Sequence, residues 1–289
     1  VIISKNGTLG DIYHINGINI GLPKQPAHIN KKNDRWKPEP YPKELSKIKK
    51  MAEWNKKDYA FKSKWIDYIE KEFDRREEGY WFMNNGKPTY ITGSHYMYLQ
   101  WSKIDVGLPD FREANRILYI FWEACKADPR CFGMCYLKIR RSGFSFMASE
   151  ECCNIGTTIR DGQVGIMSKT GEDAKALFTG KVVNMFVNYP FFFKPMQSGM
   201  DRPKQQLEFN LPASKITRKN MDDSFDIEEN GLNTIIGWSP TGDNSYDSQK
   251  LQLLIEDEAG KVVEGSILNA WRVRKTCLRL GSKIIGKCM

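Results

Sequence analysis

The chain has 289 residues, of which 40% are hydrophobic and 27% are charged, which is typical of a globular protein with one large domain or two small ones. It has no apolar run near the ~20 residues of a membrane helix and opens without the features of a signal peptide, so we expect no membrane partner. The 44 basic residues outnumber the 35 acidic ones, giving a net charge of +9. This excess favours an anionic partner such as nucleic acid, and an ordinary basic surface is the alternative.

The cysteine and histidine content argues against a disulfide framework and against a zinc site. The seven cysteines include no CxxC pair, and only three histidines accompany them. We therefore expect reduced cysteines in an intracellular protein.

The first 50 residues predict an irregular segment. Pro38, Pro40 and Pro42 alternate within a lysine-rich stretch, a spacing typical of an extended polyproline-like arm. We therefore expect residues 1–50 to form an extended N-terminal arm that lies on another surface.

Residues 51–130 predict a helical and hairpin subdomain. A helix is expected over 58–78, because apolar residues recur there every four positions between charged ones. Residues 80–91 predict a β-hairpin whose Asn-Gly turn supplies positive φ angles. A short helix, HYMYLQW, and a longer one over about 111–126 complete this α+β extension.

From residue 131 the pattern changes to alternating strands and helices. Strands are expected at 132–139, 163–168 and 251–255, with shorter ones near 205–210 and 233–238 and another from 283. Helices are expected from the turn at 140–143 to about 160, over 171–187 and over 265–280. This alternation predicts an α/β core over 131–289, with a mostly parallel central sheet flanked by helices.

The turn after the first of these strands has the parts of a phosphate-binding loop. Such a loop combines a glycine turn, exposed backbone N–H groups and a helix start with one lysine and one hydroxyl. In KIRRSGFS the glycine is Gly143 and the hydroxyl is Ser145, but Phe144 occupies the usual lysine position. Lys138, at the loop entrance, has the length to fold back across the phosphates and supply the missing charge.

Two arginines of the same loop add donors for bidentate phosphate contacts. The expected nucleotide-binding residues are Lys138, Arg140, Arg141, Ser142, Gly143, Phe144 and Ser145.

An acidic pair, Asp257 and Glu258, ends the apolar run in LLIEDEAGK. A buried strand that delivers such a pair to its tip is how many nucleotide hydrolases hold a metal and a base beside the terminal phosphate. We expect Ser145 and Asp257 to hold Mg²⁺ and Glu258 to polarise the attacking water. Glu256 alternates to the other face of the strand and is interpreted as structural. A solvated strand end is the alternative.

Four segments in order, YITGSHYMYLQW, KIRRSGFS, GIMSKTGEDAKALF and LLIEDEAGK, resemble the ATPase half of the terminase large subunit of tailed bacteriophages. The resemblance covers roughly 80–289. The lysine-first loop is similar to the deviant Walker A motif of lambda-type terminases, and DEAGK is similar to their Walker B ending. The resemblance implies a RecA/ASCE-like P-loop NTPase fold of the additional-strand class. The resemblance also matches Arg141 to the arginine that senses or stabilises the γ-phosphate. Arg141 and Glu258 are therefore the expected catalytic residues.

The resemblance also implies an activity and a setting. It implies an ATPase that uses ATP and Mg²⁺ to drive double-stranded DNA into procapsids in the host cell cytoplasm. The implied partners are the portal protein, the small terminase subunit and further copies of the chain in a homo-oligomeric ring. The family's adenine-side motif has Phe111, Arg112 and Asn115 as candidates here, without the expected glutamine. The sequence ends where the family's coupling strand begins, so we expect no nuclease activity from these residues.

Two other functions stay open at this point. A helicase-like translocase would share the core, but a second RecA-like domain and further arginine motifs are not visible in the sequence. A non-enzymatic nucleic-acid-binding scaffold is the other, and Phe144 in the lysine position favours it. The candidate DNA contacts lie on the predicted helix that contains Trp271, and they are Arg272, Arg274, Lys275 and Arg279. A solvated basic face is the alternative.

Overall fold

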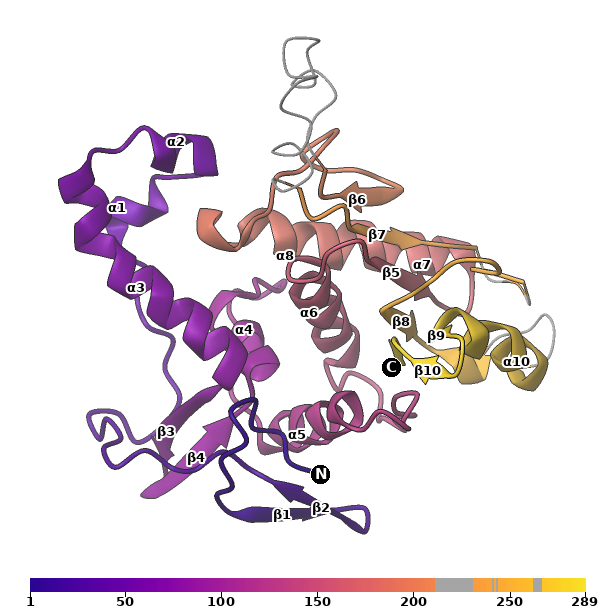
Figure 1. Cartoon of the computed structure of the whole chain (residues 1–289), viewed down its shortest axis with the longest axis horizontal. Coiled ribbons are helices and arrows are strands. Elements are labelled where there is room, and N and C mark those ends of the chain that lie inside the picture. The colour runs from indigo at the N-terminus through magenta and orange to yellow at the C-terminus, as the bar shows by residue number, and fades with distance from the viewer. Residues whose placement is uncertain (211–230, 241, 243, 262–266) are drawn as a thin grey trace. The chain divides into compact units, whose positions relative to one another are not determined.

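The computed structural model describes residues 1–210, 231–240, 242, 244–261 and 267–289, which form two compact units (Figure 1). The N-terminal unit comprises Val1–Asp128 and Pro190–Phe192, and the C-terminal unit comprises Pro129–Tyr189 and Phe193–Met289. Among the described residues, no helix has both the length and the apolar character needed to cross a membrane.

The N-terminal unit combines helices with two small antiparallel hairpins. Its elements are β1 (Ile12–Ile15), β2 (Ile18–Gly21), α1 (Lys43–Ser46), α2 (Met51–Asn55), α3 (Tyr59–Glu78), β3 (Tyr80–Asn84), β4 (Lys87–Ile91), α4 (Gly93–Trp101) and α5 (Glu113–Ala127). The predicted helices and the β3–β4 hairpin are confirmed. Local chemistry explains their bounds, because Asp58 caps α3 and Thr92 caps α4 through side-chain oxygens.

Residues 1–50 do not form one extended arm. β1 and β2 pair in an antiparallel hairpin, and Asn16 and Gly17 make its turn with φ angles of 49° and 75°. This is the same Asn-Gly signal that predicts the β3–β4 hairpin. The proline-spaced segment between β2 and the short helix α1 forms neither a strand nor a helix.

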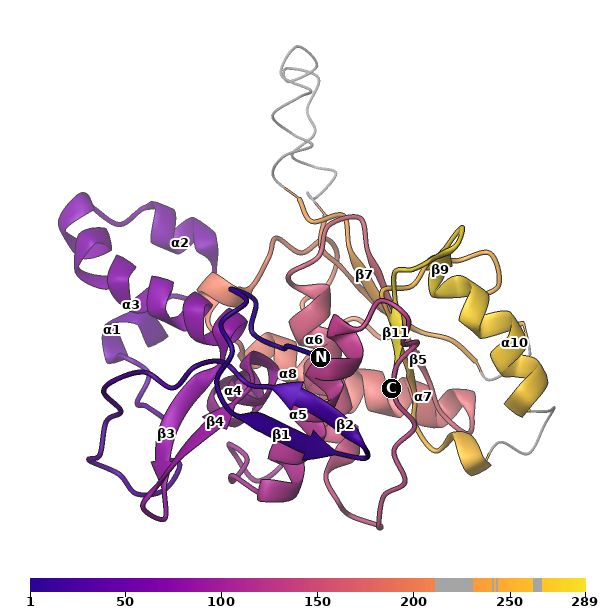
Figure 2. The ribbon, with the colours of Figure 1, turned by 60° about the horizontal axis from the view of Figure 1, so that its bottom comes forward.

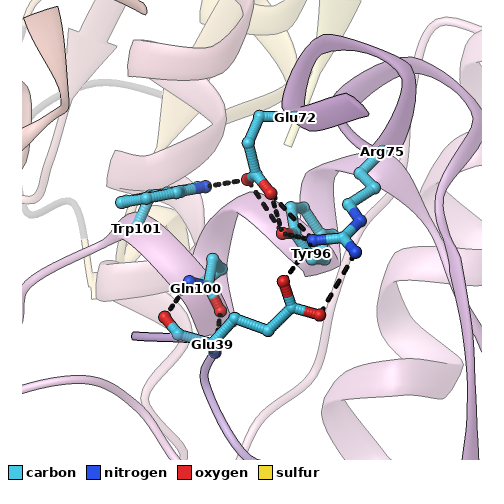
Figure 3. A network of polar contacts seen from close by, with 6 residues as sticks. All are labelled: Glu39, Glu72, Arg75, Tyr96, Gln100 and Trp101. Atoms are coloured by element: carbon cyan, nitrogen blue, oxygen red, sulfur yellow. Dashed lines mark hydrogen bonds and ion pairs between the residues drawn. The ribbon is translucent and has the colours of Figure 1, made fainter. Parts of the chain in front are cut away.

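A polar network that is exposed at Glu39 and buried at Glu72 holds this proline-spaced segment on α3 and α4 (Figure 3). The side chain of Gln100 accepts from the Glu39 N–H at 2.9 Å and donates to the Glu39 carbonyl at 2.8 Å. Arg75 donates to both carboxylate oxygens of Glu39. Arg75, Tyr96 and Trp101 all donate to the carboxylate of Glu72, which is only 1% exposed. Burial raises the pKa of Glu72, and these donors oppose that shift.

We expect Tyr96→Phe to lower the free energy of unfolding by about 1.5–3 kcal/mol, the range for a hydrogen bond to a charged group. Phenylalanine keeps the ring but removes the hydroxyl that donates to Glu72 at 2.8 Å. Urea unfolding would measure the loss. Tyr59→Phe is the matched control, because Tyr59 is 86% exposed, and its unfolding midpoint should match that of the wild type. Equal midpoints for the two variants would contradict a stabilising role for the Tyr96 hydroxyl.

The C-terminal unit is built on a five-stranded sheet in the order β11-β8-β5-β7-β6. Its strands are β5 (Gln163–Met167), β6 (Gln206–Glu208), β7 (Ile235–Trp238), β8 (Leu253–Glu256) and β11 (Lys287–Cys288), with a separate pair of β9 (Arg279–Leu280) and β10 (Lys283–Ile284). All neighbours in the sheet are parallel except β6 and β7. The fold is therefore mixed α/β with a mostly parallel sheet, as the sequence predicts.

Helices flank this sheet. They are α6 (Phe144–Gly156), α7 (Gly171–Leu177), α8 (Val183–Asn188) and α10 (Ile267–Cys277), with a π-turn (Phe178–Val182) and a 3₁₀ turn (Ala259–Lys261). Another 3₁₀ turn, Phe191–Phe193, lies mostly in the stretch that belongs to the N-terminal unit. Both views show α6 on one side of the strands and α10 on the other (Figures 1 and 2). Because both faces are covered, Val164, Ile166 and the run Leu253–Ile255 are fully buried.

Several predicted bounds in this unit are wrong. The expected helix to about 160 ends at Gly156, the helix over 171–187 is interrupted by the π-turn, and α10 ends at Cys277. The first residues of the helix expected over 265–280 lie outside the described residues.

The strand predicted at 132–139 does not form. The segment joins the edge of the sheet only at its start, where Cys288 donates to the Phe132 carbonyl at 2.7 Å and Met134 donates to the Cys288 carbonyl at 2.9 Å. Beyond Met134, no backbone hydrogen bond joins the segment to the sheet within the described residues. Farther along the segment, Leu137 and Ile139 are 99% and 82% exposed.

Candidate functional site

A cavity of about 1060 Å³ lies in the C-terminal unit. Two loops supply most of its lining, residues 132–146 before and at the start of α6 and residues 256–261 at the end of β8. The carboxyl ends of parallel strands meet at one edge of a sheet, which is where α/β proteins bind their ligands. The cavity therefore has the position expected of a ligand site.

The first loop turns sharply into α6. Arg141 and Gly143 have φ angles of 64° and 84°, in the left-handed region that favours glycine at the second position. The Gly143 carbonyl accepts from the N–H groups of Phe146 and Met147 at 3.0 and 3.2 Å. Among the described residues no side chain caps this end of α6, so the helix dipole and the N–H groups before Phe146 are available to an anion.

Lys138, Ser145 and Asp257 meet in this cavity although they are far apart in the chain. The Lys138 ammonium donates to Asp257 Oδ1 at 2.9 Å, and the Ser145 hydroxyl donates to Asp257 Oδ2 at 2.6 Å. Asp257 is 6% exposed, and its backbone N–H donates to the Met167 carbonyl of the neighbouring strand β5 at 3.0 Å. A buried carboxylate is thus held by a charge, a hydroxyl and the sheet.

Glu258 lies beside this group in a left-handed conformation, with a φ of 56°. Its carboxylate pairs with Lys261 at 2.9 Å and with Lys169 at 3.3 Å. The hydrogen bond from Lys261, followed by that from Lys169, lowers the pKa of Glu258, and the hydrogen bond to Glu258 in turn raises the pKa of Lys169. Glu258 is therefore held ionised at neutral pH.

These two lysines are the part of the site that the sequence reasoning missed. Lys261 follows the acidic pair by three residues, and Lys169 follows β5, the strand directly beside β8. The position of Lys169 after a predicted parallel strand is a usable signal, because neighbouring strand ends converge.

Phe144, in the position of the usual lysine, is a buried packing residue. It is 5% exposed and stacks on Tyr136, with ring centroids 5.4 Å apart and planes 20° apart. The Lys138 ammonium lies 4.9 Å from the centroid of the Phe144 ring, within the range of a cation–π contact. The ring thus helps to position the lysine at the loop entrance.

The other predicted loop residues also line the cavity. Arg140 and Arg141 are exposed, and no ion pair to either occurs within the described part of the chain. The Ser142 hydroxyl is buried and has no hydrogen-bond partner among the described residues.

Glu256, expected on the opposite face of the strand from Asp257, has a structural partner and also lines the cavity. It forms an ion pair with Arg274 at 3.0 Å, and Arg274 also donates to the Gly242 carbonyl at 3.2 Å. Because Arg274 is only 4% exposed, it is wrong as a DNA-contact candidate. Arg279 lies beyond α10, on β9, over the ring of Phe132. Arg272 and Lys275 are the DNA-contact candidates that remain on α10.

The adenine-side candidates belong to the N-terminal unit. Phe111 packs on His95 and Phe82, with ring centroids 5.8 and 5.2 Å away. Asn115 is 7% exposed within α5, and Arg112 immediately precedes that helix. The described residues that line the cavity include none of the three candidates.

Asp257 and Ser145 fit one class of metal site. Within the described residues, no three His, Cys, Asp or Glu side chains are grouped as a metal cage. Mg²⁺ commonly needs no such cage, because one or two carboxylates, water and substrate phosphates complete its shell. The adjoining oxygens of Asp257 and Ser145 match that incomplete set.

No family model matches this chain, and no curated protein matches it significantly.

Proposed function

We propose that the chain is the ATPase part of a DNA-packaging motor of the terminase large-subunit type, with a P-loop NTPase core. The observation that carries the proposal is the meeting of Lys138, Ser145 and Asp257 at the uncapped start of α6. A lysine, a hydroxyl and a carboxylate at a helix start are the groups that bind a metal-bound triphosphate.

The strand order supports the additional-strand class of P-loop proteins. In that class a further strand separates the strand before the phosphate loop from the strand that carries the acidic pair. Here β11 pairs with β8 on one side and bridges Gly133, at the start of the phosphate-loop segment, on the other. This order would not be expected if the loop before α6 and the loop after β8 lay at different edges of the sheet.

In the proposed mechanism the chain binds the triphosphate through charge and backbone donors. The α6 N–H groups and Lys138 hold the β- and γ-phosphates, and Arg140 and Arg141 add forked contacts from the cavity wall. Mg²⁺, held by Ser145 and Asp257, would neutralise part of the phosphate charge. Glu258 orients the attacking water and accepts its proton, a role for which its carboxylate must be ionised, although its lowered pKa makes it a weaker base.

The role in packaging rests on the sequence resemblance and on charge. A net charge of +9 and the exposed Arg272 on α10 suit contact with double-stranded DNA. The portal protein, the small terminase subunit and further copies of the chain in a ring are the partners that this role requires. The scaffold alternative loses its main support, because Lys138 brings to the cavity the charge that Phe144 lacks.

We expect Lys138→Ala to weaken binding of a fluorescent ATP analogue by about 10- to 100-fold, since a hydrogen bond to a charged group contributes about 1.5–3 kcal/mol. Titration in the presence of Mg²⁺ would measure it. Lys283→Ala is the control, because Lys283 lies exposed on β10, and its affinity should equal that of the wild type. A wild-type chain that binds no ATP, or equal affinity in both variants, would overturn the proposed site.

A further inference from the structure

Both carboxylate oxygens of Asp257, the proposed metal ligand, are already engaged by groups of the chain itself. Oδ1 accepts from the Lys138 ammonium at 2.9 Å and Oδ2 accepts from the Ser145 hydroxyl at 2.6 Å. Asp257 is 6% exposed, so its charge needs a close partner to offset the lost hydration. Lys138 provides that partner and is itself steadied against the Phe144 ring.

We propose, resting on the function above, that Lys138 takes the place of the cation beside Asp257 when no nucleotide is bound, so that Lys138 and a divalent cation compete for Asp257. A triphosphate resolves the competition because it offers Lys138 a new anionic partner. The cation is therefore admitted together with the nucleotide and is largely excluded without it.

The chemistry of the cavity supports this exclusion. An ammonium 2.9 Å from Oδ1 would repel a divalent cation on the same carboxylate, and the cavity interior screens that repulsion less than water does. Within the described residues, no three acidic, histidine or cysteine side chains are grouped as cation ligands, and the oxygens that adjoin one another are those of Asp257 and Ser145. Phosphate oxygens supply the missing ligands at the moment when they draw Lys138 away.

Such a swap couples the two ligands in both directions. If the nucleotide removes Lys138 from Asp257, it raises the affinity of the site for the cation, and the cation must raise the affinity for the nucleotide by the same factor. The swap is open to Lys138 because its long side chain is flexible and its ammonium is a compact charge.

The test is binding of Mn²⁺ alone to the nucleotide-free chain, followed by the electron paramagnetic resonance signal of free Mn²⁺. We expect Lys138→Met to bind Mn²⁺ at least about 5-fold more tightly than the wild type, the lower end of typical coupling between sites. Arg140→Met is the charge-matched control: it removes a positive charge from the same cavity wall, and its effect should be smaller. Adding Asp257→Asn to Lys138→Met should abolish the gain and so assign it to this carboxylate.

Equal Mn²⁺ affinity for Lys138→Met and the wild type, or an equal gain in Arg140→Met, would overturn the proposal. Lys138→Arg keeps the charge and should keep Mn²⁺ binding weak. If Lys138→Met is unstable because Asp257 is left unpaired, Mn²⁺ should raise its melting temperature more than that of the wild type, and an equal shift would count against competition. ATP hydrolysis by the wild type is measured separately. If the wild type hydrolyses ATP and Lys138→Met leaves the Mn²⁺ affinity unchanged, the competition alone is refuted. If Lys138→Met tightens Mn²⁺ binding and the wild type hydrolyses no ATP, the proposed function alone is refuted.

Discussion

Glu258→Gln is expected to lower ATP turnover by about 10²- to 10⁴-fold, the usual contribution of a general base, while ATP still binds. Glutamine keeps the size of the side chain and can still accept a hydrogen bond from Lys169 or Lys261, so the loop should keep its shape. It cannot accept the proton of the attacking water. The loss should therefore appear in kcat and not in the affinity for the nucleotide.

Steady-state hydrolysis and binding of a fluorescent ATP analogue would separate these two effects. Glu172→Gln is the matched control, since Glu172 lies exposed in the first turn of α7, and its turnover should equal that of the wild type. Full activity in Glu258→Gln would remove Glu258 as the base. Weak binding in that variant would instead point to a role in holding the nucleotide.

The parts of the fold that could be predicted are those determined by local chemistry. The four-residue apolar spacing and the Asp58 cap mark α3, and the Asn-Gly turn marks the β3–β4 hairpin. The fully buried run Leu253–Ile255 identifies β8 as an interior strand, because only a strand covered on both faces is apolar throughout. Each of these signals lies within a few residues of the element that it predicts.

The misplaced elements depend on partners far away in the chain. Residues 132–139 have the apolar character of a strand, but within the described residues only their start is joined to the sheet, through the bridge of Gly133 with Cys288. The ion pair of Glu258 with Lys169 depends on the register of β5 against β8, so the order of the strands indicates it and the acidic pair alone does not. The β1–β2 hairpin is a different failure: its Asn16-Gly17 turn was a local signal that the proline-rich composition of the segment obscured.

Gly133→Ala is the substitution expected to destabilise the C-terminal unit most, by about 3–5 kcal/mol, in the range of strained and overpacked variants. Gly133 has a φ of 139°, a region that residues with a Cβ rarely adopt. An added Cβ would lie 1.8 Å from the carbonyl oxygen and 2.6 Å from the nitrogen of Cys288. Both atoms belong to the backbone of β11, so neither can turn aside as a flexible side chain would.

The strain would reach the site through the bridge between Gly133 and Cys288, which ties the start of the segment before α6 to the sheet. If this bridge opens, the backbone that leads to Lys138 is no longer held in place, and its ammonium is no longer positioned to reach Asp257. Urea unfolding should therefore show a large loss of stability, and ATP binding should weaken with it. Gly180→Ala is the control, because a Cβ there would meet nothing within 4 Å, and it should leave stability unchanged or raise it by about 0.4–1 kcal/mol. Equal stability in the two variants would mean that the segment is free to shift away from β11, and that the bridge does not position Lys138.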